Sequence, residues 1–320
     1  MRRRAFITLL GGTAAWPLSL SAQPAGKVVR IGFLGPSSAA PEYQSFLKQL
    51  RELGFSEGGN CIVDYRNVDD PRGPFVAAAD LMRSQPELIV TAGPEVGLQA
   101  LVGASGFIPI VMIAINFDPL ARGYVASLAR PGGNITGVVF QQLELAQKQV
   151  ELLMQAFPQR TRLAVLFDAQ SADQFGAAER TAKALNMQLV PLKLENPPYD
   201  FDAAFRSAGG AQMALVLSSP FFIPYASRMA ELAIEHRLPA MFLKESYVEA
   251  GGLMSYGADF FLMYGRAADY AAKILRGTKP GDLPVEQANK FELFINTQTA
   301  RMLGLTIPTS LLNRADEVIE

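Results

Sequence analysis

The sequence predicts an α/β protein of two similar lobes, each with a parallel sheet flanked by helices. From Val28 onward, short apolar runs alternate with longer amphipathic ones, and after five strands the same rhythm restarts near Glu144. Helices between successive strands imply right-handed crossovers and therefore parallel sheets. A length of 320 residues suits two domains of ordinary size. Two lobes joined by a few crossings leave a cleft between them, although no residue-level repeat is visible.

The first set of elements opens with the strand VVRIGFLG and a helix at Glu42–Leu53 whose apolar residues share one face. A helix is also expected from Asp118, because Asp suits the N-cap and Pro119 the first helical position. The other expected elements are helices at 74–84 and from Pro94, and the strands CIVDYRNV, ELIVTAG, PIVMIAI and NITGVVF.

The second set starts with a helix at Glu144–Phe157. It continues with helices at 171–185, from Asp200 and from Tyr225, and with the strands RLAVLFD, MQLVPLKL, MALVLSS, PAMFLK and GGLMSYG. A helix at Phe260–Leu275, a crossing strand KFELFIN and a short terminal helix complete the chain. Gly277–Gln287 is rich in Pro and Gly and is expected to be a loop.

Composition excludes several classes of function. Hydrophobic residues make up 49% and charged residues 18%, which is typical of a globular chain. A formal net charge of -1 argues against a nucleic-acid partner, since such domains usually carry a basic face. With one Cys and one His, the sequence has no cluster typical of a zinc site, and we expect no metal and no cofactor.

The first 22 residues read as an export signal, with a basic start, an apolar stretch and small residues before Gln23. The segment RRAFI fits the twin-arginine pattern, but the general secretion route would use the same arginines as an ordinary basic start, so both routes stay open. The stretch is too short and too broken for a membrane anchor. We therefore expect cleavage near Ala22 and a periplasmic protein.

A physical rule locates the candidate site before its chemistry is known. In parallel sheets of this kind ligands bind outside the carboxyl ends of the strands, where helices begin and backbone N–H groups are free. The candidate ligand-binding residues from these segments are Ser37, Ser38, Gly93, Glu95, Asn116, Asp118, Phe140, Gln141, Asp168, Ser218, Ser219, Phe221, Phe222, Glu245 and Tyr256.

No catalytic motif is found. The phosphate-binding glycine patterns and the G-x-S-x-G elbow are absent from the sequence. His236 fits the C-terminal end of a helix, and Cys61 reads as a small packed residue. Asp168 ends a strand on the site side and suits capping as well as ligand contact. Glu245 has the same placement, and the neighbouring Lys244 could neutralise it.

Several stretches together resemble the bacterial ABC-transporter substrate-binding proteins of the periplasmic binding protein type I fold. The resemblance covers essentially the whole chain. The stretches that carry it are RRRAFITLLGG, INFDPLARGYVASLARPGGNITGV, LFDAQSADQ, NPPYDFDAAF, LVLSSPFF, RLPAMF, ESYVEAGGLMSYG, KFELFIN and LGLTIPTSLLNRADEVIE.

The resemblance implies two Rossmann-like lobes joined by three crossings, and a ligand bound in the hinged cleft between them. It implies lobes made of 23–140 with 258–288, and of 141–257 with 289–320. It also implies partners: a small-molecule solute, and an inner-membrane ABC permease with its cytoplasmic ATPase. One departure concerns the loop after the third strand, where relatives often carry a hydroxyl residue and this chain reads Thr91-Ala92-Gly93-Pro94-Glu95. This makes Glu95 a candidate partner for a ligand amine, although a glutamate in the first turn of a helix is favourable by itself.

The segment LVLSSPFF then suggests a ligand chemistry. Ser218 and Ser219 would offer donors to a carboxylate or hydroxyl, and Phe221 and Phe222 would supply an apolar wall. Alternatively the phenylalanines fill the core of the second lobe, and at least one of the two is expected there. The hypothesis is a receptor that imports a small organic solute with a carboxylate and an aromatic or branched part.

Three other functions use the same scaffold. A sensor would present its closed state to a membrane signalling protein, and the sequence does not separate it from a transport receptor. An enzyme would need a reactive residue in the cleft, where Cys61 and His236 are poorly placed. A DNA-binding regulator would need a basic helix-turn-helix headpiece, and this chain begins with an export signal instead.

Overall fold

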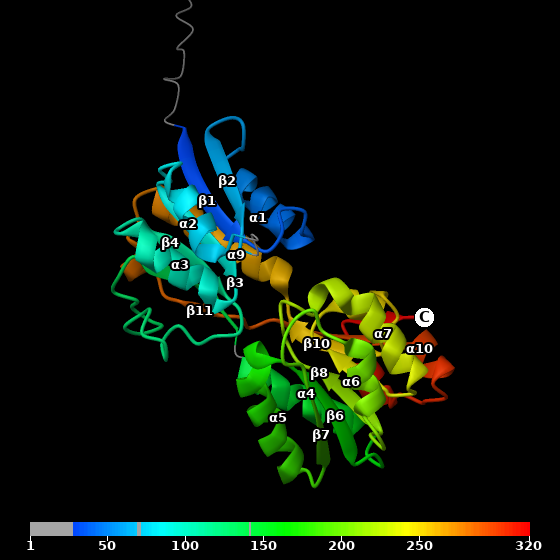
Figure 1. The fold of residues 1–320 in the computed structure, drawn as a ribbon. Helices are drawn as coiled ribbons and strands as arrows, with labels where there is room; N and C mark the ends of the chain where they lie inside the picture. The colour runs from blue at the N-terminus through cyan, green and yellow to red at the C-terminus, as the bar shows by residue number, and fades with distance from the viewer. Residues whose placement is uncertain (1–27, 69–71, 141) are drawn as a thin grey trace, which may run out of the picture.

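The computed structural model describes residues 28–68, 72–140 and 142–320, and it contains two α/β lobes (Figure 1). Each lobe has a mostly parallel sheet with helices on both faces, which confirms the predicted fold class. The expected export segment, residues 1–22, lies outside the described residues.

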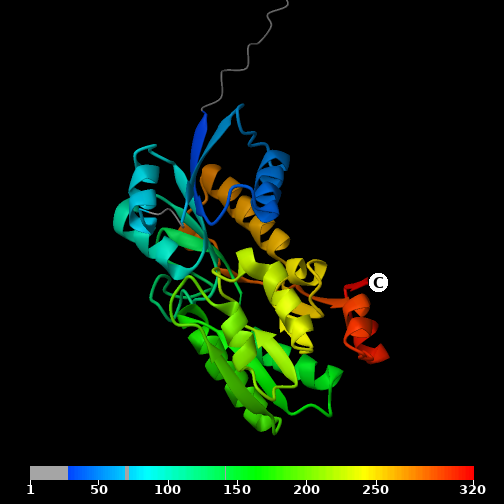
Figure 2. The same ribbon diagram turned by 45° about the vertical axis from the view of Figure 1, so that its right-hand side comes forward.

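The first lobe has a six-stranded sheet in the order β11-β5-β4-β3-β1-β2, and all its strand pairs are parallel. Its strands are β1 (Val29–Gly35), β2 (Cys61–Asn67), β3 (Leu88–Gly93), β4 (Ile110–Ala114), β5 (Ile135–Val139) and β11 (Glu286–Gln287). Its helices are α1 (Pro41–Glu52), α2 (Pro74–Met82), α3 (Glu95–Ser105) and α9 (Phe260–Leu275). Helices α1 and α9 lie side by side on one face, and α2 and α3 cover the other (Figure 2).

The second lobe has a seven-stranded sheet in the order β13-β12-β10-β9-β8-β6-β7. Its strands are β6 (Arg162–Phe167), β7 (Gln188–Lys193), β8 (Met213–Val216), β9 (Ala240–Phe242), β10 (Met254–Ala258), β12 (Phe291–Asn296) and β13 (Glu317–Ile319). Its helices are α4 (Gln142–Ala156), α5 (Ala172–Ala184), α6 (Phe201–Ser207), α7 (Ala226–Glu235), α8 (Glu245–Glu249), α10 (Thr297–Met302) and α11 (Thr309–Leu312). Only the β10–β12 pair is antiparallel among these described strands.

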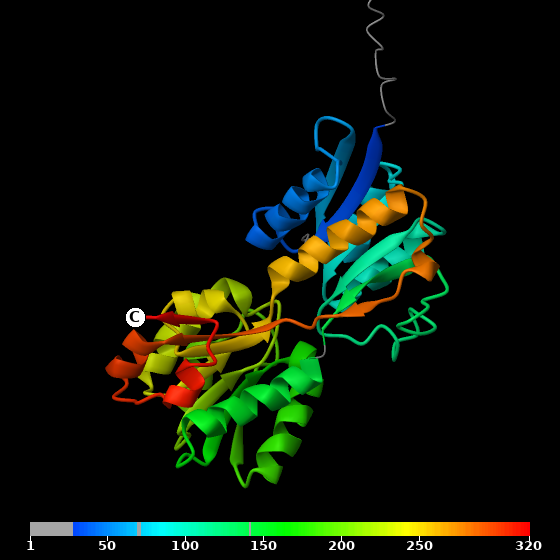
Figure 3. The ribbon, with the colours of Figure 1, turned by 180° about the vertical axis from the view of Figure 1, so that it is seen from behind.

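The chain passes between the lobes three times, after β5, after β10 and between β11 and β12. Figure 3 shows the last passage as the segment that leads from β11 into β12 beside the start of α9. The carboxyl ends of β5 and β10 therefore lie at the junction of the lobes.

The helix expected from Asp118 does not form. Asp118 caps a turn, in which its Oδ1 accepts hydrogen bonds from the backbone N–H groups of Leu120 at 2.9 Å and Ala121 at 3.2 Å. The chain then reverses at Gly123, whose φ of 77° lies in the left-handed region. Asp118 thus caps a turn. The turn does not continue as a helix, because the chain reverses at Gly123.

Two other corrections concern sheet edges. The expected loop at Gly277–Gln287 ends in the two-residue strand β11, which pairs with β5. The last residues form β13 beside β12, where only a helix was expected. Such short edge strands are stabilised by their neighbour in the sheet, so local sequence carries little sign of them.

Gly137 is required where β4 and β5 approach each other. A Cβ at this position would lie 2.0 Å from the carbonyl oxygen of Met112, and its φ is 140°. Gly133, four residues earlier, has open space around its Cα and an ordinary φ.

We expect Gly137→Ala to lower the free energy of unfolding by about 2–4 kcal/mol, because the methyl group would push β5 away from β4. Gly133→Ala should change it by less than about 0.5 kcal/mol. Urea denaturation followed by circular dichroism measures both. Equal effects of the two substitutions would contradict the close approach.

Candidate functional site

The carboxyl ends of the strands from both lobes meet at one interface, as the sequence predicts. Two pairs of side chains bridge it. One joins Asn116, in the loop after β4, to Ser218, in the loop after β8. The other joins Glu42, in the first turn of α1, to Lys244, which precedes α8. In this structure the lobes therefore touch directly.

Asn116 recognises Ser218 with both ends of its side-chain amide. Its Nδ2 donates to the Ser218 carbonyl oxygen at 2.9 Å, and its Oδ1 accepts from the Ser218 hydroxyl at 3.0 Å. Gln174 on α5 holds the same serine from behind, donating to its carbonyl oxygen at 3.1 Å and accepting from its N–H at 3.0 Å. Asn116 has a φ of 70°, a conformation that Asn tolerates better than most residues. The Asn116 side chain thus bonds to a serine that Gln174 already holds in position.

Lys244 and Glu42 form the second bridge. The Lys244 ammonium donates to Glu42 Oε1, and it lies 5.0 Å from the centre of the Phe260 ring. From the sequence, Lys244 could neutralise Glu245, but the structure pairs it with Glu42 of the opposite lobe. Both side chains of the pair are largely shielded from solvent, at 16% and 11% exposed.

Asp168 is a structural organiser rather than an exposed ligand contact. It is fully buried and caps the turn that precedes α5, where its Oδ1 accepts from the backbone N–H groups of Gln170 at 3.0 Å and Ser171 at 3.2 Å. Its Oδ2 accepts from the Ser219 hydroxyl at 2.5 Å and from the Tyr199 hydroxyl at 3.1 Å. Of the two alternatives left open by the sequence, capping is the one that the structure shows.

These bonds change the expected role of the two serines. The Ser218 hydroxyl is used by Asn116 and the Ser219 hydroxyl by Asp168, and both residues are buried. Neither hydroxyl is free to meet a ligand carboxylate in this arrangement of the lobes. Tyr199, which the sequence reading missed, is held by the same carboxylate, and burial together with the Asp168 charge raises its pKa to about 12.

The two phenylalanines of the segment LVLSSPFF have different environments. Phe222 is completely buried in the core between β8 and helices α6 and α7, so the alternative reading is right for it. Phe221 is 41% exposed, and its ring centre lies 6.2 Å from that of Tyr199. Phe140 is also a core residue, packed edge-on against Phe260 at 5.6 Å. Phe222 and Phe140 therefore do not present an aromatic surface to the cleft here.

The remaining candidates from the first lobe lie along the same edge. Ser37 and Ser38 are exposed between β1 and α1, and Asp118 is exposed in the turn after β4. Gly93 is buried at the end of β3. Glu95 already has partners in this structure. Its carboxylate accepts a hydrogen bond from the Tyr124 hydroxyl at 2.9 Å and forms an ion pair with Arg122 at 3.4 Å.

The candidates at the crossings give a mixed result. Gln141 lies outside the described residues. Tyr256 on β10 stacks on Phe291 with ring centres 6.0 Å apart, and its backbone carbonyl accepts from Gln149. Because side chains alternate along a strand, Tyr256 points away from the face that Ser255 and Gly257 share.

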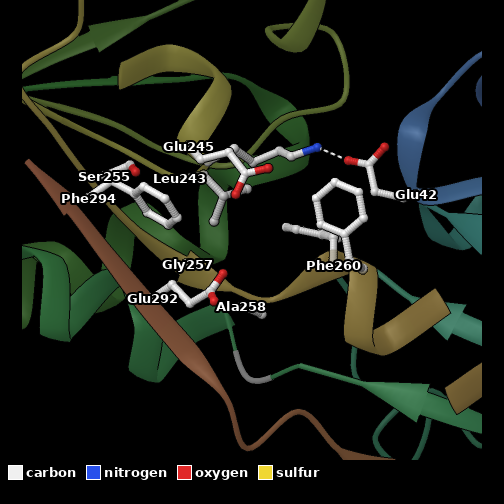
Figure 4. Close-up of a pocket in the computed structure, with 11 residues that line it drawn as sticks. Glu42, Leu243, Glu245, Ser255, Gly257, Ala258, Phe260, Glu292 and Phe294 are labelled. Carbon is white, nitrogen blue, oxygen red and sulfur yellow. Dashed lines mark hydrogen bonds and ion pairs between the residues drawn. The ribbon is translucent and has the colours of Figure 1, made fainter. Parts of the chain in front are cut away.

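A small pocket lies on that face, between the two lobes (Figure 4). Its lining residues are Glu42, Leu243, Lys244, Glu245, Ser255, Gly257, Ala258, Phe260, Phe261, Glu292 and Phe294. Figure 4 shows the carboxylates of Glu245 and Glu292 directed into the space between them. Of the sequence candidates within the described ranges, only Glu245 lines this pocket, and burial raises the pKa of its carboxyl.

Sequence reasoning missed Glu42, Ser255 and Glu292 at this pocket. Glu42 stands in the first turn of the helix after β1, so the rule of strand ends could have found it. Ser255 and Glu292 lie within β10 and β12, and become pocket residues only because the antiparallel pairing puts Gly257 opposite Glu292 and Ser255 opposite Phe294.

Two further properties bear on function. Within residues 28–68, 72–140 and 142–320, no group of three or more His, Cys, Asp or Glu side chains is placed to hold a metal ion. None of the described helices combines the length and the apolar character that a membrane span needs.

The comparison with known families decides where the chain belongs. The family described as ABC transporter substrate binding protein matches residues 28–319. The chain belongs to this family. It is 24% identical over 265 residues to a tyrosine-binding protein of Clostridioides difficile, which covers 82% of this chain and 76% of that protein.

Solved structures resemble this substrate-binding protein over most of its length. A conserved domain protein from Vibrio cholerae has a TM-score of 0.81 at 26% identity, covering 91% of this chain and 100% of the other. An ABC domain in complex with L-Trp from Streptococcus pneumonia has a TM-score of 0.80 at 22% identity, covering 91% and 99%. These likenesses confirm the fold of a two-lobed substrate-binding protein.

The bond between Asn116 and Ser218 should favour the arrangement in which the lobes touch. Asn116→Gly removes both hydrogen bonds to Ser218 and accepts the positive φ without strain. We expect the free protein to open, which small-angle X-ray scattering would record as a larger radius of gyration. Ser38→Ala, an exposed position on the same edge, should leave the scattering profile as it is. A profile unchanged by Asn116→Gly would show that this bond does not hold the lobes together.

Replacing Asp168 should destabilise the second lobe. Asp168→Asn sets an NH2 group against hydroxyl and N–H donors in a buried site, so we expect a loss of about 2–4 kcal/mol in the free energy of unfolding. Asp173→Asn, exposed in the first turn of α5, should cost less than about 0.5 kcal/mol. Denaturation in urea compares them. A cost at Asp168 as small as at Asp173 would contradict its role as organiser.

Proposed function

We propose that this chain is the solute-binding component of an ABC importer, which captures a small organic solute between its lobes. The observation that carries the proposal is the meeting of polar side chains from both lobes at the carboxyl ends of the strands, through Asn116 with Ser218 and Glu42 with Lys244. A ligand that touches both lobes stabilises the closed form relative to the open one. A partner protein that binds the closed form responds to this change in population.

The solute class that we propose carries a carboxylate and an aromatic or branched apolar part. Phe221, exposed beside Tyr199, is the aromatic surface that the second lobe offers to such a group. Opening of the lobes would release Asn116 and the Ser218 hydroxyl from each other, and both could then bind a carboxylate. Two similar proteins support this solute class. One is a tyrosine-binding protein, and the other is the ABC domain whose structure is a complex with L-Trp.

The proposed partners are an inner-membrane permease and the ATPase that powers it. We further propose export to the periplasm, with a signal segment cleaved near Ala22, by the twin-arginine or the general secretion route. The family itself is one of substrate-binding proteins of ABC transporters.

We propose a receptor and not a catalyst. The most nucleophilic side chain type, the thiol of Cys61, is buried in the core of the first lobe, and burial raises its pKa to about 11. His236 lies at the C-terminal end of α7 beside the Phe205 ring. Neither residue is at the interface of the lobes.

Isothermal titration calorimetry of protein that has been unfolded and refolded to strip carried-over ligand tests this function. We expect saturable binding of L-tyrosine, L-tryptophan or L-leucine, and none of glucose or adenosine. Phe221→Ala should weaken binding at least about tenfold through loss of apolar contact.

Phe107 provides the matched control. It is 99% exposed and precedes β4, at the opposite end of the sheet, so Phe107→Ala should leave affinity unchanged. Absence of saturable binding for the three amino acids would reject the proposed solute class. An equal loss of affinity in Phe221→Ala and Phe107→Ala would show that Phe221 does not contact the solute.

A further inference from the structure

We propose that the interlobe pocket lined by Glu245, Glu292 and Ser255 binds a primary ammonium group of the solute. This inference rests on the proposed function and adds a second recognition element to it. The solute would then be an amine-bearing molecule, and its deaminated analogue would be rejected.

The first argument is size. The pocket encloses about 20 Å³, which is enough for one water-sized group. An ammonium group has this size, whereas a ring or a carboxylate with its attached carbon does not fit. The pocket is therefore a subsite for one polar group, while the remainder of the solute lies outside it.

The second argument is a hydroxyl that needs a partner. Ser255 is 1% exposed and lines the pocket, and its Oγ has no hydrogen-bond partner among the described residues. Leaving a buried hydroxyl unpaired costs roughly 1–3 kcal/mol in proteins. A hydrogen-bond donor in the pocket would remove this cost, since the hydroxyl oxygen can accept.

The third argument is charge. The pocket is lined by three carboxylates and one ammonium, those of Glu42, Glu245, Glu292 and Lys244. Lys244 is paired with Glu42, and Glu292 with Lys290 at 2.7 Å outside the pocket. Glu245 forms no hydrogen bond or ion pair within the described part of the chain. A half-buried, unpaired carboxylate that lines the same pocket as an unpaired hydroxyl favours a cation that donates hydrogen bonds.

The pKa of Glu245 is consistent with this reading. Burial raises the pKa of the Glu245 carboxyl and is the largest cause of the shift. The charge of Lys244 lowers this pKa, and the neighbouring carboxylates of Glu249, Glu292 and Glu42 raise it further. The charged form of Glu245 is thus disfavoured in the empty site, and an entering ammonium would favour it again. The affinity for an amine should therefore fall as the pH is lowered, because Glu245 becomes protonated. This fall should begin at a higher pH than the pKa of an ordinary glutamate would give.

An ammonium group fits better than a metal ion. No group of at least three His, Cys, Asp and Glu ligands is assembled anywhere in the described ranges. The walls contributed by Leu243, Phe260 and Phe294 are apolar, which suits the carbon attached to an amine. Residues of both lobes line the pocket, so an ammonium held here would also bridge them.

The test compares matched pairs of compounds by calorimetry with the whole mature protein. The pairs are L-tyrosine with 3-(4-hydroxyphenyl)propionate, L-tryptophan with 3-indolepropionate, and L-leucine with 4-methylpentanoate. We expect the amine-bearing member of the pair that binds to exceed its deaminated partner in affinity by at least about tenfold.

Two substitutions on α8 locate the effect. Glu245→Gln keeps the size of the side chain and removes its charge, so it should weaken the amine at least about tenfold and abolish its loss of affinity at low pH. Binding of the deaminated compound should stay the same or improve, which a general loss of structure would not produce. Glu249→Gln, exposed on the same helix and outside the pocket, should leave the affinities for both compounds at neutral pH within about twofold. It should keep the loss of amine affinity at low pH, moved to a slightly lower pH because one carboxylate that raises the pKa of Glu245 is gone.

The outcomes separate this inference from the proposed function. Equal affinity for both members of a pair, or an equal loss in Glu245→Gln and Glu249→Gln, would overturn the ammonium subsite and leave the receptor intact. Binding of neither member of any pair would overturn the proposed solute class and the subsite with it. Selective loss of the amine in Glu245→Gln alone would establish the subsite.

Discussion

The contact between Asn116 and Ser218 is the constraint on which the arrangement of this protein depends. Each lobe has its own core, and three crossings of the chain join the lobes. Two neutral hydrogen bonds contribute only about 1 kcal/mol each, so this contact can favour closure without locking it. A receptor needs this balance, because a solute can shift a population only where the two states are close in free energy.

The second lobe presents Ser218 in a fixed position, and that rigidity has its own cause. Gln174 holds the serine backbone from α5, while the buried Asp168 ties the neighbouring Ser219 to Tyr199 and to the turn before α5. The carboxylate is stable in the interior because its oxygens accept several hydrogen bonds. The interface residue Ser218 is thus held in place by a polar network within the second lobe.

The sequence predicted that polar residues after the strands gather at one edge, but it did not predict the partners of their side chains. Asn116, Ser218 and Glu245 all follow strands, and topology alone brings such residues together. Phe222 and Phe221 are adjacent and chemically identical, yet one fills the core and the other faces solvent. Local sequence does not distinguish them, because the direction of each ring is decided by how α6 and α7 pack around this loop.

The pocket illustrates the same limit more strongly. Ser255 and Glu292 lie in two strands of opposite direction, and no motif links them. Their proximity results from the register of β10 against β12 and from the placement of Glu42 across the junction of the lobes.

By itself the sequence determined the order of most strands and helices, the mostly parallel sheets and the two-lobed class, and it predicted the edge where a solute would bind. These follow from periodicity and from the handedness of crossovers, which are local properties of the chain. Only the tertiary structure decided that Asp168 is an internal cap, that Lys244 pairs with Glu42 rather than Glu245, and that Glu245 and Ser255 remain unsatisfied beside one small pocket. Such pairings depend on which groups meet across the lobes, and partners far apart in sequence are chosen by packing.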